Sequence, residues 1–263
     1  NINNYLMLLK KYKFLNNQIK FKANLNHNIS ITLDKTYKVI DYDYKNKGKI
    51  NNLNLKFNKP INNSLLENNL KNINLKESNL ITHYNNKKNN FIKTTGSYSF
   101  NKDTFQSYEF KNNFSNSNSD IEINFNYTPK LNLEFINYKK KDNTVAKISS
   151  KFEFKKDLIN FKEINYKENK NFILIEDLKI KKKYIISFKK ILVKTFSSNE
   201  LKNDFKLDFG KKINIQGTKY DAKNLNKILN QNSKNSSLKN IAKNINIEID
   251  NIETPLSKNL KNF

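Results

Sequence analysis

The stretch Ile121-Glu122-Ile123-Asn124-Phe125-Asn126-Tyr127 alternates apolar and polar side chains without interruption. Successive side chains of a β-strand point to opposite faces, so this segment would have one apolar face and one polar face. The same alternation returns at residues 19–25, 131–135, 205–209 and 245–249. The pattern predicts a mainly β protein, built as an elongated, twisted antiparallel β-sheet with an open, taco-like apolar groove and one or two short helices.

The apolar members of this alternation are the candidate functional residues, because they would share one face of the sheet. We expect the groove to be lined by Ile19, Phe21, Leu25, Ile121, Ile123, Phe125, Leu131, Leu133, Phe135, Phe205, Leu207 and Phe209.

Three segments are expected along the chain. Residues 1–111 read as a β-rich segment that opens with a short helix at Asn4–Asn16. Residues 112–120, rich in Asn and Ser, are interpreted as a linker, and residues 121–263 as a second β-repeat segment. In the second segment Asp221 suits the N-cap of a short helix near 222–230. Because the chain begins at Asn1 with the pattern already under way, we interpret it as a fragment of a longer protein.

The positive charge of the chain suggests a partner that carries phosphate, but it does not identify that partner. The net charge is +25, and every basic residue is a lysine. Such an excess attracts phosphate, whether on nucleic acid or on lipid headgroups. The lysines mostly occupy the polar half of each strand, where a solvated face would place them. Nucleic acid is not favoured as the partner, because its readers prefer the bidentate arginine fork.

Catalytic and metal-binding chemistry has little support in the sequence. There is no cysteine, and four glycines leave little material for a phosphate-cradling loop. His27 and His83 are expected to be exposed residues in turns or at strand ends, with no carboxylate at ligand spacing. Asp41 and Asp43 could act as paired carboxylates, but they alternate with tyrosines as on an ordinary strand. We therefore expect a protein that is not an enzyme and needs no metal or cofactor.

A run of aromatic side chains allows a second interpretation. Six rings interleave with polar residues at Phe91, Tyr98, Phe100, Phe105, Tyr108 and Phe110. In a single-strand or RNA binder such rings would stack on bases along a sheet face. No RNP-type signature accompanies them, so lining of a core or groove is the favoured interpretation.

The region from Ile148 to Ile249 resembles a known family. Short strands follow one another at Ser150–Asn160, Phe172–Ile180 and Ile185–Thr195, and then Ile213–Leu225 leads through an aspartate into a short helix and a new strand. This succession is similar to the AsmA-like, YhdP-type envelope proteins of Gram-negative bacteria. The resemblance is best over about the last hundred residues and looser over 19–57.

The resemblance implies a function as well as a fold. It implies an N-terminal membrane anchor outside this fragment, a periplasmic location in the cell envelope, and a long sheet with an apolar groove that carries phospholipid between inner and outer membranes. Phospholipid acyl chains would be the partner, which requires no catalytic residue. Two alternatives stay open: a basic ribosomal or organellar RNA-binding β-protein, and a structural β-repeat segment without a ligand.

Overall fold

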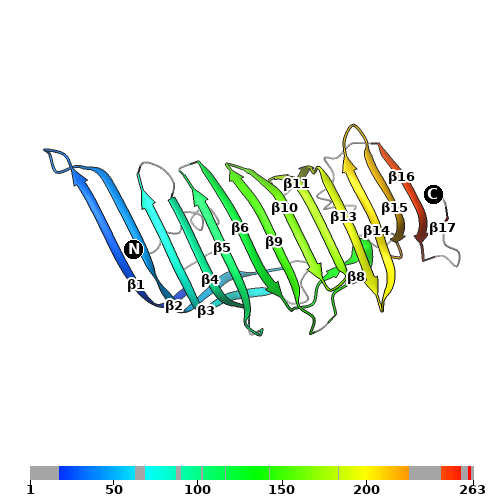
Figure 1. Ribbon diagram of the computed structural model, residues 1–263, viewed down its shortest axis with the longest axis horizontal. Coiled ribbons are helices and arrows are strands. Elements are labelled where there is room, and N and C mark those ends of the chain that lie inside the picture. Colours follow the sequence, from blue (N-terminus) through cyan, green and yellow to red (C-terminus); the bar gives the residue numbers. More distant parts are fainter. Residues whose placement is uncertain are drawn as a thin grey trace. The chain divides into compact units, whose positions relative to one another are not determined.

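The computed structural model describes residues 18–62, 69–86, 90–101, 103–115, 117–141, 143–182, 184–224, 244–255 and 260–261. The chain divides into two compact units, Asn1–Ser115 and Asn116–Phe263. Strands dominate the described part of both units, which confirms the mainly β prediction (Figure 1).

The first unit is an antiparallel meander in which each strand pairs with the next in the chain. Its strands are β1 (Gln18–Leu33), β2 (Val39–Ile61), β3 (Leu70–Asn85), β4 (Asn90–Phe100) and β5 (Gln106–Phe114). In the described residues β1 pairs only with β2, so this sheet is open rather than closed into a ring of strands.

In the second unit, too, most strands pair with the next strand in the chain, and there are more of them. Its sheet contains β6 (Asn118–Tyr127), β9 (Ala146–Lys155), β10 (Leu158–Glu168), β11 (Asn171–Lys181), β13 (Lys190–Ser197), β14 (Glu200–Phe209), β15 (Ile213–Asp221), β16 (Ile245–Glu253) and β17 (Leu260–Lys261), in that order. The short β12 (Tyr184–Ser187) pairs with β11. Between β6 and β9 the chain forms β7 (Asn132–Leu133), the 3-10 turn η2 (Glu134–Ile136) and β8 (Tyr138–Lys139).

One pair of strands departs from the expected antiparallel arrangement. β15 and β16 run parallel, with Ile213 beside Ile245 and Gly217 beside Ile249. A parallel pair needs a long crossover connection, whereas a hairpin turn joins an antiparallel pair. Residues 222–244 supply that length. The sheet is therefore mixed, because this connection returns the chain to the edge where β15 began.

In several turns asparagine adopts the left-handed backbone conformation that glycine usually adopts. Asn101, Asn137, Asn143, Asn169 and Asn199 all have positive φ angles, between 49° and 68°. Asparagine tolerates this left-handed conformation better than most residues because its short amide can hydrogen-bond locally. A chain with only four glycines can therefore still make many tight hairpins.

The predicted boundary between the two segments agrees with the structure, but the predicted linker does not. Asn112–Phe114 belong to β5 and Asn118–Asp120 to β6, so most of the predicted 112–120 linker is strand. Its Asn and Ser residues suggested a loop, but cross-strand pairing accommodates them, as Ile92 opposite Asn112 shows. The boundary between the two units falls within this stretch. The predicted helices at 4–16 and near 222–230 lie outside the described residues, apart from 222–224.

Candidate functional site

An apolar face runs across the strands of the first unit. Residues paired across neighbouring strands point to the same side of a sheet, so the register identifies each face. One row on this face consists of Phe21, Leu53, Leu75 and Tyr98, and the next of Ile19, Leu55, Ile73 and Phe100. Leu25 follows on the same face of β1, so the three predicted lining residues of this unit lie together as expected from the alternation.

This face is most open along β1. Ile29, Ile31 and Leu33 continue the apolar side of β1, and their exposed fractions are 60%, 57% and 46%. Apolar side chains so exposed and contiguous are typical of an interaction surface rather than of scattered surface hydrophobics. The apolar face of the first unit therefore has an accessible margin at β1.

The opposite face of the same sheet is polar. Lys20, Asn54, Asn74 and Ser99 form a row across its first four strands. The amide Nδ2 of Asn74 donates to Ser99 Oγ over 3.2 Å and to the carbonyl oxygen of Asn101 over 2.8 Å. Lysine and asparagine thus occupy the polar face, on which Lys20 is exposed, Asn54 and Asn74 are half-buried and Ser99 is buried.

The apolar face of the second unit is longer. A single row crosses eight strands through Phe125, Ile148, Tyr166, Ile173, Val193, Phe205, Gly217 and Ile249. The adjacent row consists of Ile123, Ser150, Ile164, Ile175, Ile191, Leu207, Ile215 and Ile247. Beyond it lie Ile121 and Phe209, so all six residues predicted from β6 and β14 lie on this face.

The remaining predicted lining residues, Leu131, Leu133 and Phe135, do not belong to the strands of the large sheet. Leu131 and Phe135 lie outside the large sheet, and Leu133 is in β7, which pairs only with β8. Phe135 is in the 3-10 turn and is 48% exposed. The alternation at 131–135 is real, but it belongs to a separate layer. We call residues 128–145 the strap; residue 142 in it is outside the described part.

The strap covers one end of the apolar face in the second unit. The last row of that face is small or polar, at Ala146, Glu168, Thr195 and Asn203, and these residues are at most 3% exposed. From the strap, Ile136, Tyr138 and Lys140 are at most 4% exposed. Lys140 Nζ donates to the carbonyl oxygens of Thr128 and Lys141 over 2.8 and 3.1 Å, which satisfies its buried ammonium within the strap.

A carboxylate on β10 anchors the strap. Glu168 accepts hydrogen bonds from the hydroxyls of Tyr138 and Thr144 in the strap, and from Asn171 Nδ2 over 3.2 Å. The hydroxyls of Tyr138 and Tyr166 lie 2.8 Å apart. Burial, together with the hydrogen bond to Glu168, raises the pKa of Tyr138 well above its ordinary value. The buried carboxylate of Glu168 accepts several hydrogen bonds within the fold. Its role is therefore structural: it holds the strap against β10.

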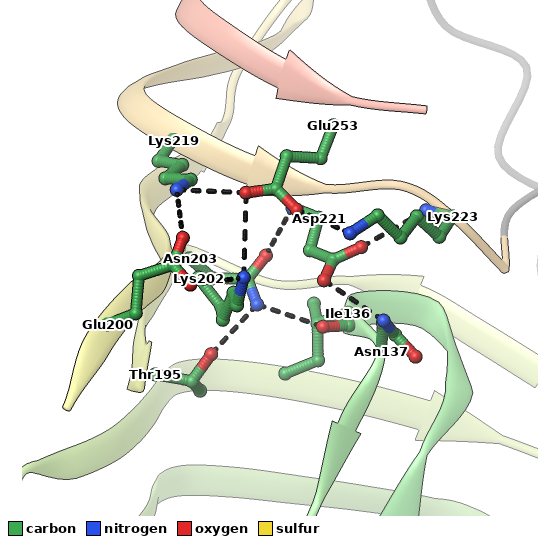
Figure 2. Close-up of polar contacts among 10 residues, drawn as sticks. All are labelled: Ile136, Asn137, Thr195, Glu200, Lys202, Asn203, Lys219, Asp221, Lys223 and Glu253. Atoms are coloured by element: carbon green, nitrogen blue, oxygen red, sulfur yellow. Dashed lines mark hydrogen bonds and ion pairs between the residues drawn. The ribbon is translucent and has the colours of Figure 1, made fainter. Parts of the chain in front are cut away.

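Asn203 on β14 anchors the strap from the other side (Figure 2). Its Nδ2 donates to the carbonyl oxygen of Ile136 and to Thr195 Oγ1, both over 2.8 Å, and its Oδ1 accepts the Asp221 amide over 2.9 Å. Asn137 Nδ2 then donates to Asp221 Oδ2 over 2.9 Å. Asn203 is 0% exposed, so one amide connects strap, β14 and β15 inside the protein.

Next to Asn203, the carboxylate of Glu253 on β16 forms ion pairs with three lysines. Its carboxylate lies 2.9 Å from Lys219 Nζ, 2.7 Å from Lys223 Nζ and 3.8 Å from Lys202 Nζ (Figure 2). Burial alone would raise the pKa of Glu253, but the hydrogen bonds from Lys219 and Lys223 outweigh it and lower the pKa to about 2. The cluster joins β14, β15 and β16.

The pKa of Glu253 predicts loss of stability in acid. A depressed pKa stabilises the fold above the ordinary value of 4.5, and this contribution disappears as the pH falls towards about 2. The shift corresponds to about 3 kcal/mol. Urea unfolding of wild type and of Glu253→Gln at pH 7 and pH 3 checks this. The difference between the two proteins should shrink markedly at pH 3, and an unchanged difference would contradict the assignment.

The sequence analysis missed a contact of His83. His83 is in β3, not in a turn, and its Nε2 bonds to Asp43 on the neighbouring strand β2. Hydrogen bonds from His83 and Lys45 lower the pKa of Asp43. His27 is likewise within β1, with Nδ1 2.8 Å from the Tyr44 hydroxyl. These pairs come from cross-strand register over long sequence separations, which residue spacing alone does not reveal.

The six rings considered for base stacking do not form one platform. Tyr98, Phe100, Tyr108 and Phe110 are on the apolar face, whereas Phe91, paired with His83, is on the polar face, and Phe105 precedes β5. Over the described residues, no three His, Cys, Asp or Glu side chains gather as metal ligands would. Nor does any helix there have the length and apolar content needed to span a bilayer.

A comparison of the chain with protein-family models, curated proteins and solved structures gave no match. Function therefore has to be inferred from the surface chemistry of the two units.

Proposed function

We propose that the apolar faces of this protein bind the acyl chains of phospholipids, and that the protein is a non-enzymatic carrier of lipid in the cell envelope. The observation that carries the proposal is the exposed apolar margin along β1, at Ile29, Ile31 and Leu33. The apolar row across eight strands of the second unit supports it, with Phe125, Ile148 and Ile173 half-buried and the other large members of the row buried. A periplasmic location with an anchor in the inner membrane belongs to the same proposal.

Physical chemistry makes acyl chains a suitable ligand for such a face. Covering ten methylene groups would release about 8 kcal/mol, at about 0.8 kcal/mol for each group. Lipid tails present no polar groups, so they need no directional partners among the side chains. The polar face, rich in lysine and asparagine, would keep the protein soluble around a bound lipid.

The direct test is extraction of the purified chain with organic solvent, followed by mass spectrometry of the extract. Phospholipid in a reproducible molar ratio is expected. Absence of lipid after purification and after incubation with phosphatidylcholine vesicles would contradict the proposal. Tight RNA binding that weakens steeply with salt would favour the nucleic-acid alternative instead.

A pair of isoleucines in the first unit offers a matched comparison. Ile31 is on the apolar face and is 57% exposed, whereas Ile81 is on the polar face between Lys47 and Lys93 and is 38% exposed. Ile31→Asn is expected to lower the amount of lipid that this unit retains by about threefold or more, because it places an amide among acyl methylenes. Ile81→Asn should leave retention unchanged. Equal effects of both substitutions would show that the apolar face is not the binding surface.

A further inference from the structure

The β1–β2 hairpin ends in a group of exposed apolar side chains at the edge of the first unit (Figure 1). We call residues 33–42 the hairpin tip. Its exposed apolar side chains are Leu33, Tyr37, Val39, Ile40 and Tyr42. Tyr37, in the turn itself, is 85% exposed, and Val39 beside it is 58% exposed. Contiguous apolar side chains this accessible are typical of an interaction surface.

The hairpin tip reaches beyond the neighbouring strand β3. In the described part of the chain β3 pairs with β2 only as far as Asp43, and beyond it Asn86 Nδ2 donates to the carbonyl oxygen of Ile40 over 2.8 Å. Ile40 is an extra residue in β2, because the register with β1 shifts between Thr32 and Leu33. Such a bulge twists a strand and changes the direction of a side chain. The tip is therefore a two-stranded projection that presents its apolar residues at the end.

Tyr37 occupies a backbone conformation that does not suit it. Its φ angle is 61°, and among the described residues with positive φ it is the only aromatic one, whereas five are asparagines. The turn is held by Asp34 Oδ1, which accepts the amides of Thr36 and Lys38 over 2.7 and 2.9 Å. Asparagine would form the same turn with less strain. Turn geometry therefore does not account for the ring, and strain of this kind is typical of functional positions.

The charges of the hairpin tip do not explain an interaction surface by themselves. The charged groups from the turn to the start of the β2–β3 pairing are Asp34, Lys35, Lys38, Asp41 and Asp43. Lys35 and Lys38 are exposed on either side of Tyr37. Asp34 is engaged in the turn, and Asp43 bonds to His83. Because the lysines do not outnumber the carboxylates, affinity at the tip has to come from its apolar side chains.

We propose that the hairpin tip inserts into the surface layer of a phospholipid bilayer. Tyr37, Val39 and Ile40 would lie between the headgroups and the first acyl methylenes. The ring and hydroxyl of tyrosine suit that boundary, where tyrosine is enriched in membrane proteins. Lys35 and Lys38 would extend their stems to the phosphates. The main-chain polar groups at the open edge of β1 limit insertion to this layer, because the hydrocarbon core offers them no hydrogen bonds.

A bilayer suits the hairpin tip better than a second copy of the chain does. Two copies with a net charge of +25 each repel one another, whereas a bilayer surface presents phosphates. The inference goes beyond the proposed function, because it assigns an element that docks on a membrane and does not require a lipid bound on the apolar faces.

Tryptophan fluorescence tests the insertion directly, because the chain has no tryptophan of its own. Tyr37→Trp places the fluorophore at the hairpin tip, and Phe105→Trp places it at another exposed position of the same unit. Phosphatidylcholine vesicles carry no net charge, so the overall charge of the chain does not drive binding to them. We expect the emission of Tyr37→Trp to shift to shorter wavelength and to be quenched by brominated acyl chains, and that of Phe105→Trp to stay unchanged.

Flotation of the full chain with phosphatidylcholine vesicles measures the contribution of the tip to binding. Y37N/I40N is expected to bind roughly tenfold more weakly, because it removes apolar area from the interface. Asparagine suits the positive φ at residue 37, so the turn should stay folded, which circular dichroism checks. The control F105N/I186N removes a ring and an isoleucine that are 45% and 44% exposed elsewhere. It should change binding by less than about twofold.

The outcomes separate this inference from the proposed function. Equal losses in the two double variants, or equal emission shifts at residues 37 and 105, would overturn the hairpin tip as the inserting element. A shift of Tyr37→Trp that grows with protein concentration in the absence of vesicles would overturn it too, since a second copy would then cover the tip. Insertion of the tip without phospholipid in the solvent extract would leave this inference standing and reject the proposed function. Phospholipid in the extract without insertion would do the reverse.

Discussion

Gly217→Val is expected to destabilise the second unit by about 3–5 kcal/mol, because a side chain at this position would collide with the neighbouring strand. A Cβ built on Gly217 would overlap the carbonyl oxygen of Asp204 and come within 2.6 Å of the Phe205 Cα. Both obstacles are main-chain atoms of β14, so no side-chain rotation relieves the overlap. The strands would have to separate, with loss of ladder hydrogen bonds between β14 and β15.

Gly210 provides the control for this experiment. It is in the turn between β14 and β15, and the nearest atom to a Cβ there is the Lys212 carbonyl oxygen, at 3.7 Å. Gly210→Ala is therefore expected to change stability by no more than about 1 kcal/mol, and in the stabilising direction. Urea unfolding followed by circular dichroism measures both. A Gly217→Val protein as stable as the wild type would show that β14 and β15 do not approach as closely as described.

Asn203→Leu is expected to release the strap and to cost about 3 kcal/mol or more, since it leaves buried polar groups without their partner. The carbonyl oxygen of Ile136, the hydroxyl of Thr195 and the amide of Asp221 would each lose a hydrogen bond to Asn203. Leucine has a similar volume, so the loss comes from hydrogen bonding rather than from a cavity. The measurements are urea unfolding and the rate of trypsin cleavage within the strap, after Lys139 and Lys141.

Asn214→Leu is the matched substitution on the neighbouring strand β15, at a half-buried position opposite Asp208 and Asn246. It should change stability by no more than about 0.5 kcal/mol and leave trypsin cleavage of the strap at the wild-type rate. Cleavage that is equally slow in Asn203→Leu would mean that Glu168 alone holds the strap, and that the amide of Asn203 has no part in closing this end of the apolar face.

How well the sequence predicts the site differs between its parts. Ile19, Phe21 and Leu25, and likewise Phe205, Leu207 and Phe209, were expected on one face and lie there, because alternation along a strand is a local property of the backbone. Leu131, Leu133 and Phe135 show the same alternation but lie in the strap. A strand joins a sheet only where another strand offers its hydrogen-bonding edge, and local patterning carries no information about that edge.

The strap anchors show the same limit for polar residues. Glu168 and Asn203 occupy positions that continue the apolar face of β10 and β14, where polarity in the sequence suggests only a strand end. Each is buried by a segment distant in the chain, since Asn203 bonds to Ile136 and Glu168 to Tyr138. Such contacts depend on how the intervening strands are paired, and the residue pattern along one strand does not specify that pairing.

Residue order alone sets the β character of this protein, the division of its strands into an apolar and a lysine-rich face, and the placing of many of its turns at asparagines. These properties follow from the alternation of side chains along each strand and from the conformations that single residues tolerate. Folding in three dimensions sets the parallel pairing of β15 with β16 and the strap that closes one end of the apolar face. These depend on distant segments meeting, and the entropy lost when they meet is repaid only by contacts between them.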